Sequence, residues 1–164
     1  MNTTVFFEDR LHGLIETLKL YWRRPPRRQI GAFCYRLDSD GPKVLLITTR
    51  NARRWILPKG WPMIRRSGAQ IAEREAFEEA GIIGIANPKP LGRFRSFKGL
   101  GKDFRVTTEV TVYPILVTGS AEKFPEVGKR QLVWLPLDQA IERCDEPGLR
   151  ELFHSKEVRE LLNS

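Results

Sequence analysis

Three glutamates in one short segment are the residues best placed to do chemistry. Glu75, Glu78 and Glu79 stand at positions i, i+3 and i+4, directly after Arg74. On a helix such positions are neighbours, with Cβ atoms about 5 to 6 Å apart, so the carboxylates would crowd one face and repel each other. A hard divalent cation, Mg²⁺ or Mn²⁺, prefers such oxygen ligands. The segment predicts either a metal site or a surface helix whose acids pair with Arg74 and other arginines.

The rest of the composition offers few other catalytic groups. The 164 residues include two cysteines, in unrelated parts of the chain, and two histidines. This leaves little material for a zinc site, a disulfide framework or serine-histidine-acid catalysis. Catalysis must therefore come mainly from carboxylates, cations and the backbone.

Positive charge is concentrated before the glutamates. The net charge is +8, from 28 basic and 20 acidic residues, whereas residues 23–66 hold twelve cations against two acids, a balance of +10. Such a segment indicates a polyanionic partner, a phosphorylated small molecule, a nucleic acid or an acidic membrane surface, or else a solvated basic face. No RNP-type signature, zinc finger or basic heptad accompanies it, which weakens the nucleic-acid interpretation. No apolar run approaches the roughly 20 residues of a membrane helix, and the acidic N-terminus predicts a cytoplasmic protein.

The glutamates need a helix, and the flanking residues predict one. Ser67 and Gln70 fit a capping box at its start, and Gly81 fits its end. Strands are expected over 30–35, 43–48, 91–97, 104–117 and 131–135, and closing helices over 137–144 and 148–162. Apolar periodicity over 6–22 predicts an N-terminal helical extension with a basic linker, residues 1–26, before one domain, residues 27–164. The predicted class is α/β, a mixed sheet with helices packed on it.

The motif resembles the Nudix box, G-x5-E-x7-R-E-U-x-E-E-x-G-U, where U is an apolar residue. The matching residues are Gly60, Arg74, Glu75, Ala76, Glu78, Glu79, Gly81 and Ile82. At roughly 6% usage per residue type, the Arg, the three Glu and the final Gly alone would coincide about once in a million windows. Arg66 departs from the pattern, because the family has its first glutamate there. Over residues 27–153 the chain is similar to the diphosphoinositol polyphosphate phosphohydrolases and related dinucleoside polyphosphate hydrolases.

The resemblance implies an α/β/α sandwich with a loop-helix-loop motif, and it implies roles for the box residues. Glu78 and Glu79 would be metal ligands, and Glu75 either a third ligand or the base that orients water. Arg74 would orient a box glutamate through an ion pair. Further candidate metal ligands are the backbone carbonyl of Lys59 and the side chain of Glu126.

The resemblance also implies a substrate site. Gly60 would allow close backbone approach, and cations for a polyphosphate would come from Arg27, Arg28, Lys59 and Arg130. The expected function is metal-dependent hydrolysis of a P–O–P bond in a highly charged substrate, a diphosphoinositol polyphosphate or a dinucleoside polyphosphate. Two alternatives remain: an RNA 5′-pyrophosphohydrolase, and a noncatalytic Nudix-fold module that binds a ligand or RNA. An intact Arg-Glu-x-x-Glu-Glu argues against the noncatalytic module.

Overall fold

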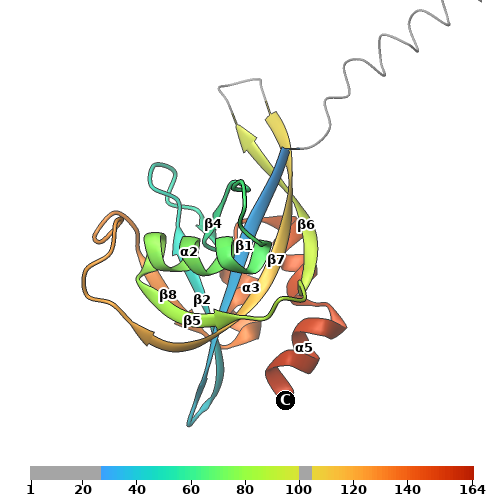
Figure 1. The fold of residues 1–164 in the computed structure, drawn as a ribbon. Coiled ribbons are helices and arrows are strands. Elements are labelled where there is room, and N and C mark those ends of the chain that lie inside the picture. Colours follow the sequence, from blue (N-terminus) through green and yellow to red (C-terminus); the bar gives the residue numbers. More distant parts are fainter. Residues whose placement is uncertain (1–26, 100–104) are drawn as a thin grey trace, which may run out of the picture.

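A mixed β-sheet lies between helices in the computed structural model, which describes residues 27–99 and 105–164 (Figure 1). The strands are β1 (Arg27–Asp38), β2 (Gly41–Thr48), β3 (Trp55–Ile56), β4 (Lys59–Gly60), β5 (Ile82–Ala86), β6 (Gly92–Gly99), β7 (Arg105–Ser120) and β8 (Leu132–Leu135). The helices are α2 (Gly68–Ala80), α3 (Leu137–Arg143), α4 (Pro147–Phe153) and α5 (Lys156–Asn163).

One parallel pair of strands joins the two halves of the sheet. The main strand order is β3-β2-β1-β7-β5, and β4, β6 and β8 pair with β1, β7 and β2. β1 runs parallel to β7 from the Arg27–Thr108 pair to the Tyr35–Leu116 pair, whereas the other pairings are antiparallel. The sheet is therefore mixed, as the sequence predicts.

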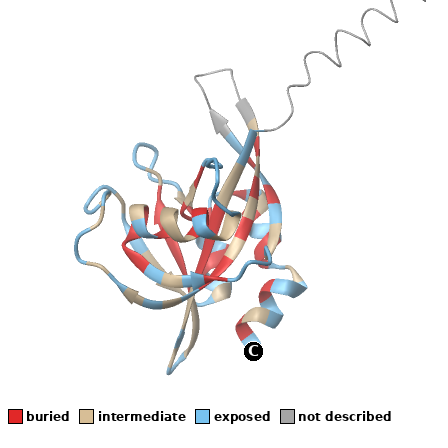
Figure 2. Cartoon of the chain, viewed as in Figure 1, coloured by how far each residue is buried: buried red, intermediate tan, exposed pale blue. Residues whose placement is uncertain are grey.

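Both faces of the sheet are covered. On β2, Val44 and Leu46 pack in a core with α3, α4 and α5, whereas Leu45 and Ile47 pack on the opposite face with α2. This alternation follows from the two-residue period of a strand. Figure 2 shows the buried residues along the strands and on the side of α2 that faces them. The predicted α/β sandwich is thus confirmed.

Helix α2 begins and ends where the sequence predicts. The Ser67 hydroxyl accepts a hydrogen bond from the backbone N–H of Gln70, and the Gln70 side chain accepts one from the backbone N–H of Ser67. Gly81 ends the helix at φ 68°, a left-handed conformation that favours glycine. These two ends fix which helix face carries each box glutamate.

The remaining elements agree with the predicted ones apart from details. The antiparallel β1–β2 hairpin is confirmed. Strands β3, β4 and β5 were not predicted; β3 and β4 have two residues each, too few for a strand pattern, and β5 begins directly after Gly81 at the end of α2. The last helical segment is divided in two, since Ser155 caps a new helix by accepting a hydrogen bond from the Val158 N–H. The predicted helix over 6–22 lies outside the described residues. Within the described ranges, every helix is too short or too polar to span a bilayer.

Candidate active site

The short strand β4 brings the backbone of Lys59 and Gly60 against helix α2. Lys59 pairs with Gly31 of β1, and its backbone N–H donates to Oε2 of Glu79 at 3.1 Å. A Cβ added at Gly60 would collide with the carboxyl group of Glu75. Glycine is therefore what allows the Glu75 carboxylate to lie against the strand.

Glu79 is the most buried of the three box glutamates. Its side chain is 10% exposed and forms an ion pair with the guanidinium of Arg130. Burial raises its pKa to about 7, and the charges of Glu75 and Glu126 add to that effect, while Arg130 and the Lys59 N–H oppose it. The raised pKa shows that the positive charge near this carboxylate does not fully compensate its burial.

Arg130 connects the box to the loop that precedes β8. Its Nε donates to Glu126 Oε2 at 2.6 Å and its Nη1 to the backbone carbonyl of Thr48 at 3.0 Å. The backbone N–H of Glu126 donates to the carbonyl of Glu78 at 3.0 Å, which ties this loop to α2. Glu126, a predicted ligand far from the box in sequence, thus lies beside it.

The other two box glutamates have different surroundings. Glu78 pairs with Arg74, whose Nε lies 2.5 Å from Oε1, so Arg74 contacts a box glutamate as the resemblance implies. Burial raises the pKa of Glu75, and the negative charges of Glu78 and Glu126 contribute. Acidic charge therefore accumulates around Glu75.

The chemistry of this donor set fits a hard divalent cation. Glu75, Glu78, Glu79 and Glu126 offer oxygen atoms, and burial and mutual repulsion raise the pKa of Glu75 and Glu79. In the parts of the chain that the structure describes, no three acidic, histidine or cysteine side chains are already grouped as a ligand set. Glu78 is paired with Arg74, and Glu79 and Glu126 are paired with Arg130, so a metal ion would compete with these arginines for the three carboxylates.

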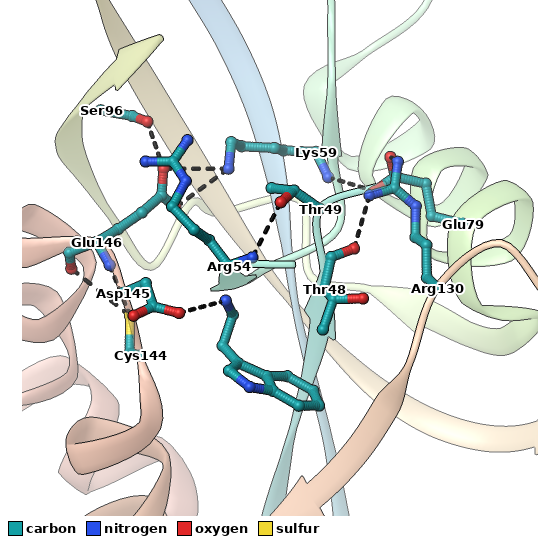
Figure 3. A network of polar contacts seen from close by, with 11 residues as sticks. Thr48, Thr49, Arg54, Lys59, Glu79, Ser96, Arg130, Cys144, Asp145 and Glu146 are labelled. Carbon is teal, nitrogen blue, oxygen red and sulfur yellow. Dashed lines mark hydrogen bonds and ion pairs between the residues drawn. The ribbon is translucent and has the colours of Figure 1, made fainter. Parts of the chain in front are cut away.

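The carboxylate of Glu146, which sequence reasoning missed, binds the side chain of Lys59, whereas Glu79 binds the Lys59 backbone (Figure 3). The Lys59 ammonium pairs with both oxygens of Glu146 at 3.1 and 3.2 Å, and the Ser96 hydroxyl also donates to Glu146. Glu146 occupies the N-cap position of α4, where its side chain makes no capping hydrogen bond, and it lies 87 residues beyond Lys59. No motif marks it, so the sequence held no signal for this contact.

The Glu79–Arg130 and Glu146–Lys59 pairs both line one cavity of about 300 Å³. Its charged lining residues are Arg50, Arg54, Lys59, Glu79, Arg130 and Glu146, and its other lining residues include Gln29, Asn51, Ser96 and Phe97. Arg27 and Arg28, predicted to bind substrate, are exposed at the start of β1 and outside this lining. Of the predicted substrate cations, the structure brings Lys59 and Arg130 to the cavity, each already paired with a carboxylate.

The two cysteines are buried and uncharged at neutral pH. Burial raises the pKa of the Cys144 thiol to about 11, and it raises that of Cys34 further. Because the thiolate is the reactive form, neither cysteine is suited to act as a nucleophile. The reactive groups of the site are the carboxylates and cations.

Similar proteins share this sequence and this fold. The family model described as "NUDIX domain" matches residues 27–155. Nudix hydrolase 18, mitochondrial, of Arabidopsis thaliana is 31% identical over 132 residues, which cover 76% of this chain and 73% of that protein. Diphosphoinositol polyphosphate phosphohydrolase 3-beta of Bos taurus is 27% identical over 126 residues, 74% of this chain and 72% of that protein.

Solved structures agree with the fold. A binary complex of a C. elegans Ap4A hydrolase has a TM-score of 0.61 at 19% identity, with 84% of this chain and 98% of that chain covered. The NUDIX domain of Shewanella oneidensis NrtR, in complex with ADP ribose, has a TM-score of 0.60 at 18% identity, with 90% and 98% covered. The match over residues 27–155 and the 31% identity to an Arabidopsis hydrolase show that the chain belongs to the Nudix hydrolase family.

Proposed function

We propose that this Nudix hydrolase is a metal-dependent enzyme that cleaves a P–O–P bond in a polyphosphorylated small molecule. The observation that supports this most is the buried Glu79 carboxylate, which lines the cavity beside Arg130 and near Glu75 and Glu126. Nudix hydrolases generally use divalent metal ions, and we propose Mg²⁺ or Mn²⁺ held by Glu75, Glu78 and Glu79, with Glu126 and the Lys59 carbonyl as further ligands.

The reaction is attack of water on phosphorus with loss of a phosphate leaving group. A bound divalent cation would supply charge stabilisation for the phosphoryl oxygens. Glu75, held against Gly60, orients the attacking water and takes its proton when it is not itself a ligand. Arg50 and Arg54 line the cavity and offer guanidinium groups to the phosphates. Arg74 holds Glu78 in place.

The substrate is proposed to be highly charged, a dinucleoside polyphosphate or a diphosphoinositol polyphosphate. The cavity favours the nucleoside-bearing one, because it contains the ring of Phe97 and the amide side chains of Gln29 and Asn51. Phe97 is 49% exposed, so its ring is available to stack on a base, and amides can hydrogen-bond to base edges. An RNA with a 5′ pyrophosphate is a second candidate that the same groups could bind. Cytoplasmic location stays a prediction, since several relatives carry "mitochondrial" in their names.

Glu79→Gln tests the metal-dependent hydrolysis. The amide keeps the shape of the side chain and removes its charge, so turnover at limiting Mg²⁺ should fall by roughly 100-fold or more. Glu142→Gln, on the exposed side of α3, is the matched control. Hydrolysis of a panel of pyrophosphate compounds should be followed with Mg²⁺ and with Mn²⁺. Near wild-type turnover in Glu79→Gln would overturn the assignment.

Phe97→Leu tests the nucleoside part of the substrate. Loss of stacking, worth about 1 to 3 kcal/mol per base, should raise KM for a dinucleoside polyphosphate by roughly tenfold or more. Trp61→Leu is the control, because Trp61 is also exposed, at 43%, and does not line the cavity. Equal KM values in the two variants would leave the nucleoside preference without support and would favour the inositol phosphate.

A further inference from the structure

Lys59 and Glu146 form a buried ion pair in the wall of the cavity. Lys59 Nζ lies 3.2 Å from Oε1 and 3.1 Å from Oε2 of Glu146. The two side chains are 12% and 7% exposed, and Ser96 adds a hydrogen bond to the carboxylate. All three residues line the cavity, so the pair belongs to the surface that a bound substrate would meet.

This pair presents little net charge to an incoming phosphate. A phosphate attracted by the ammonium is repelled by the carboxylate bonded to it, and the two Coulomb energies largely cancel at similar distances. Burial keeps the two groups together, because a lysine left without its partner here would be an uncompensated buried charge. Lys59 in this arrangement contributes a dipole to the cavity where a lone lysine would contribute a full positive charge.

The same neutralisation occurs on the other side of the cavity, where Arg130 pairs with Glu79. The charged lining comprises four cations and two acids, a balance of +2. Two of those cations, Arg50 and Arg54, lie in the exposed loop between β2 and β3. The Arg50 side chain is 59% exposed, and its Nη1 lies 3.5 Å from Oε1 of Glu126. This ion pair is longer and more exposed than the Lys59–Glu146 pair, so a phosphate can reach the guanidinium of Arg50 more easily than the ammonium of Lys59.

We propose that Glu146 is a specificity-determining residue: by neutralising Lys59 it limits the phosphate charge that the cavity binds, so that each additional phosphate group gains less affinity than it would beside a lone lysine. The phosphates of the substrate then meet Arg50 and Arg54. Of the two proposed substrates, the cavity disfavours the more densely charged diphosphoinositol polyphosphate relative to the phosphate chain of a dinucleoside polyphosphate. The inference rests on the proposed binding of substrate phosphates in this cavity. The inference also gives a role to Glu146, which lies outside the Nudix box.

The test is the binding of inorganic pyrophosphate and tripolyphosphate to the full chain, measured by calorimetry in EDTA so that no hydrolysis occurs. Glu146→Gln preserves an acceptor for Ser96 and removes the charge. Its Kd for tripolyphosphate should fall by about tenfold, the size expected for one unit charge a few Å away with partial screening, and the Kd for pyrophosphate should fall less. The matched control is Glu151→Gln, which removes an exposed charge from α4 and should change neither Kd.

A double variant decides between a neutralised and a phosphate-binding lysine. Lys59→Met with Glu146→Gln removes both charges, and joint removal of a buried pair is often tolerated by the fold. Its Kd for tripolyphosphate should stay within about threefold of wild type if the pair is electrostatically neutral to the ligand. A loss of about tenfold or more would show that Lys59 itself binds phosphate and would overturn the inference, as would weaker binding by a folded Glu146→Gln.

The wild-type titration separates this inference from the proposed function. If wild type and Glu146→Gln both fail to bind tripolyphosphate, the inference is wrong, because the cavity then holds no phosphate chain. Hydrolysis by wild type and its loss in Glu79→Gln would still support the enzyme. If instead neither hydrolysis nor its dependence on Glu79 is found while the Kd values shift as expected, the proposed function fails and the charge role of Glu146 stands.

Discussion

Gly60 lies directly against the carboxyl group of Glu75, closer than any side chain at position 60 would allow. The strand that contains Gly60 pairs with β1 through the Ile30–Gly60 register, so the backbone at residue 60 is held in the sheet. Steric contact between the two residues would therefore be relieved by movement of the glutamate. The glycine at the start of the box thus controls the position of a carboxylate 15 residues further along the chain.

Gly60→Ala should damage activity more than stability. The atoms that the new methyl group would meet belong to the end of the flexible Glu75 side chain, which can move aside. A displacement of about 1 Å at a reacting group can cost about 100-fold in rate, whereas overpacking costs about 1 to 3 kcal/mol of folding free energy. We expect kcat to fall by about 100-fold while the protein stays folded, as measured by steady-state kinetics and urea unfolding.

Gly119→Ala is the matched control for this prediction. Gly119 lies on β7, and a Cβ there would meet no atom within 4 Å. This variant should retain wild-type kcat. If Gly60→Ala were as active as Gly119→Ala, the position of Glu75 against the strand would have no bearing on turnover.

Arg66 occupies the position of the family's first box glutamate, and the structure places it in the exposed turn before α2. Its backbone N–H contacts the carbonyl of Met63 at 3.4 Å. We expect Arg66→Glu to change the Mg²⁺ concentration for half-maximal activity by less than about fivefold, because exposed charges contribute at most about 1 kcal/mol. Arg65→Glu makes the same charge change at an exposed neighbouring position. A rise in turnover by orders of magnitude in Arg66→Glu alone would indicate that the natural protein is a weakened enzyme and would favour a binding role.

The parts of the site that sequence analysis predicted are those set by local spacing. Ser67, Gln70 and Gly81 determine the ends of α2 through contacts within a few residues, so the helix could be predicted together with the face carrying Glu75, Glu78 and Glu79. The hairpin of β1 and β2 was predictable for the same reason, since its turn residues lie between two apolar runs.

The contacts that could not be predicted join residues far apart in the chain. Lys59 meets Glu146 across 87 positions, and Arg130 meets Glu79 across 51. From the sequence, each of these basic residues is predicted to bind a phosphate, because no neighbouring residue indicates that a distant carboxylate packs against it. These pairs form only when α4 and the loop before β8 pack onto the sheet. The residue pattern within a single segment does not predict such packing.

A double variant of Arg27 and Arg28 tests whether the basic segment contributes to substrate binding outside the cavity lining. Both are exposed, directly before the cavity residue Gln29. Changing both to glutamine should raise KM for a polyphosphate by about tenfold, because charge-assisted hydrogen bonds are lost. The salt dependence of kcat/KM should also flatten, since the Debye length falls from about 10 Å at 0.1 M to about 3 Å at 1 M. Lys89 and Arg159, both exposed elsewhere, provide a control double variant with the same loss of charge. An unchanged KM and salt slope in the first pair would show that these arginines form only a solvated face.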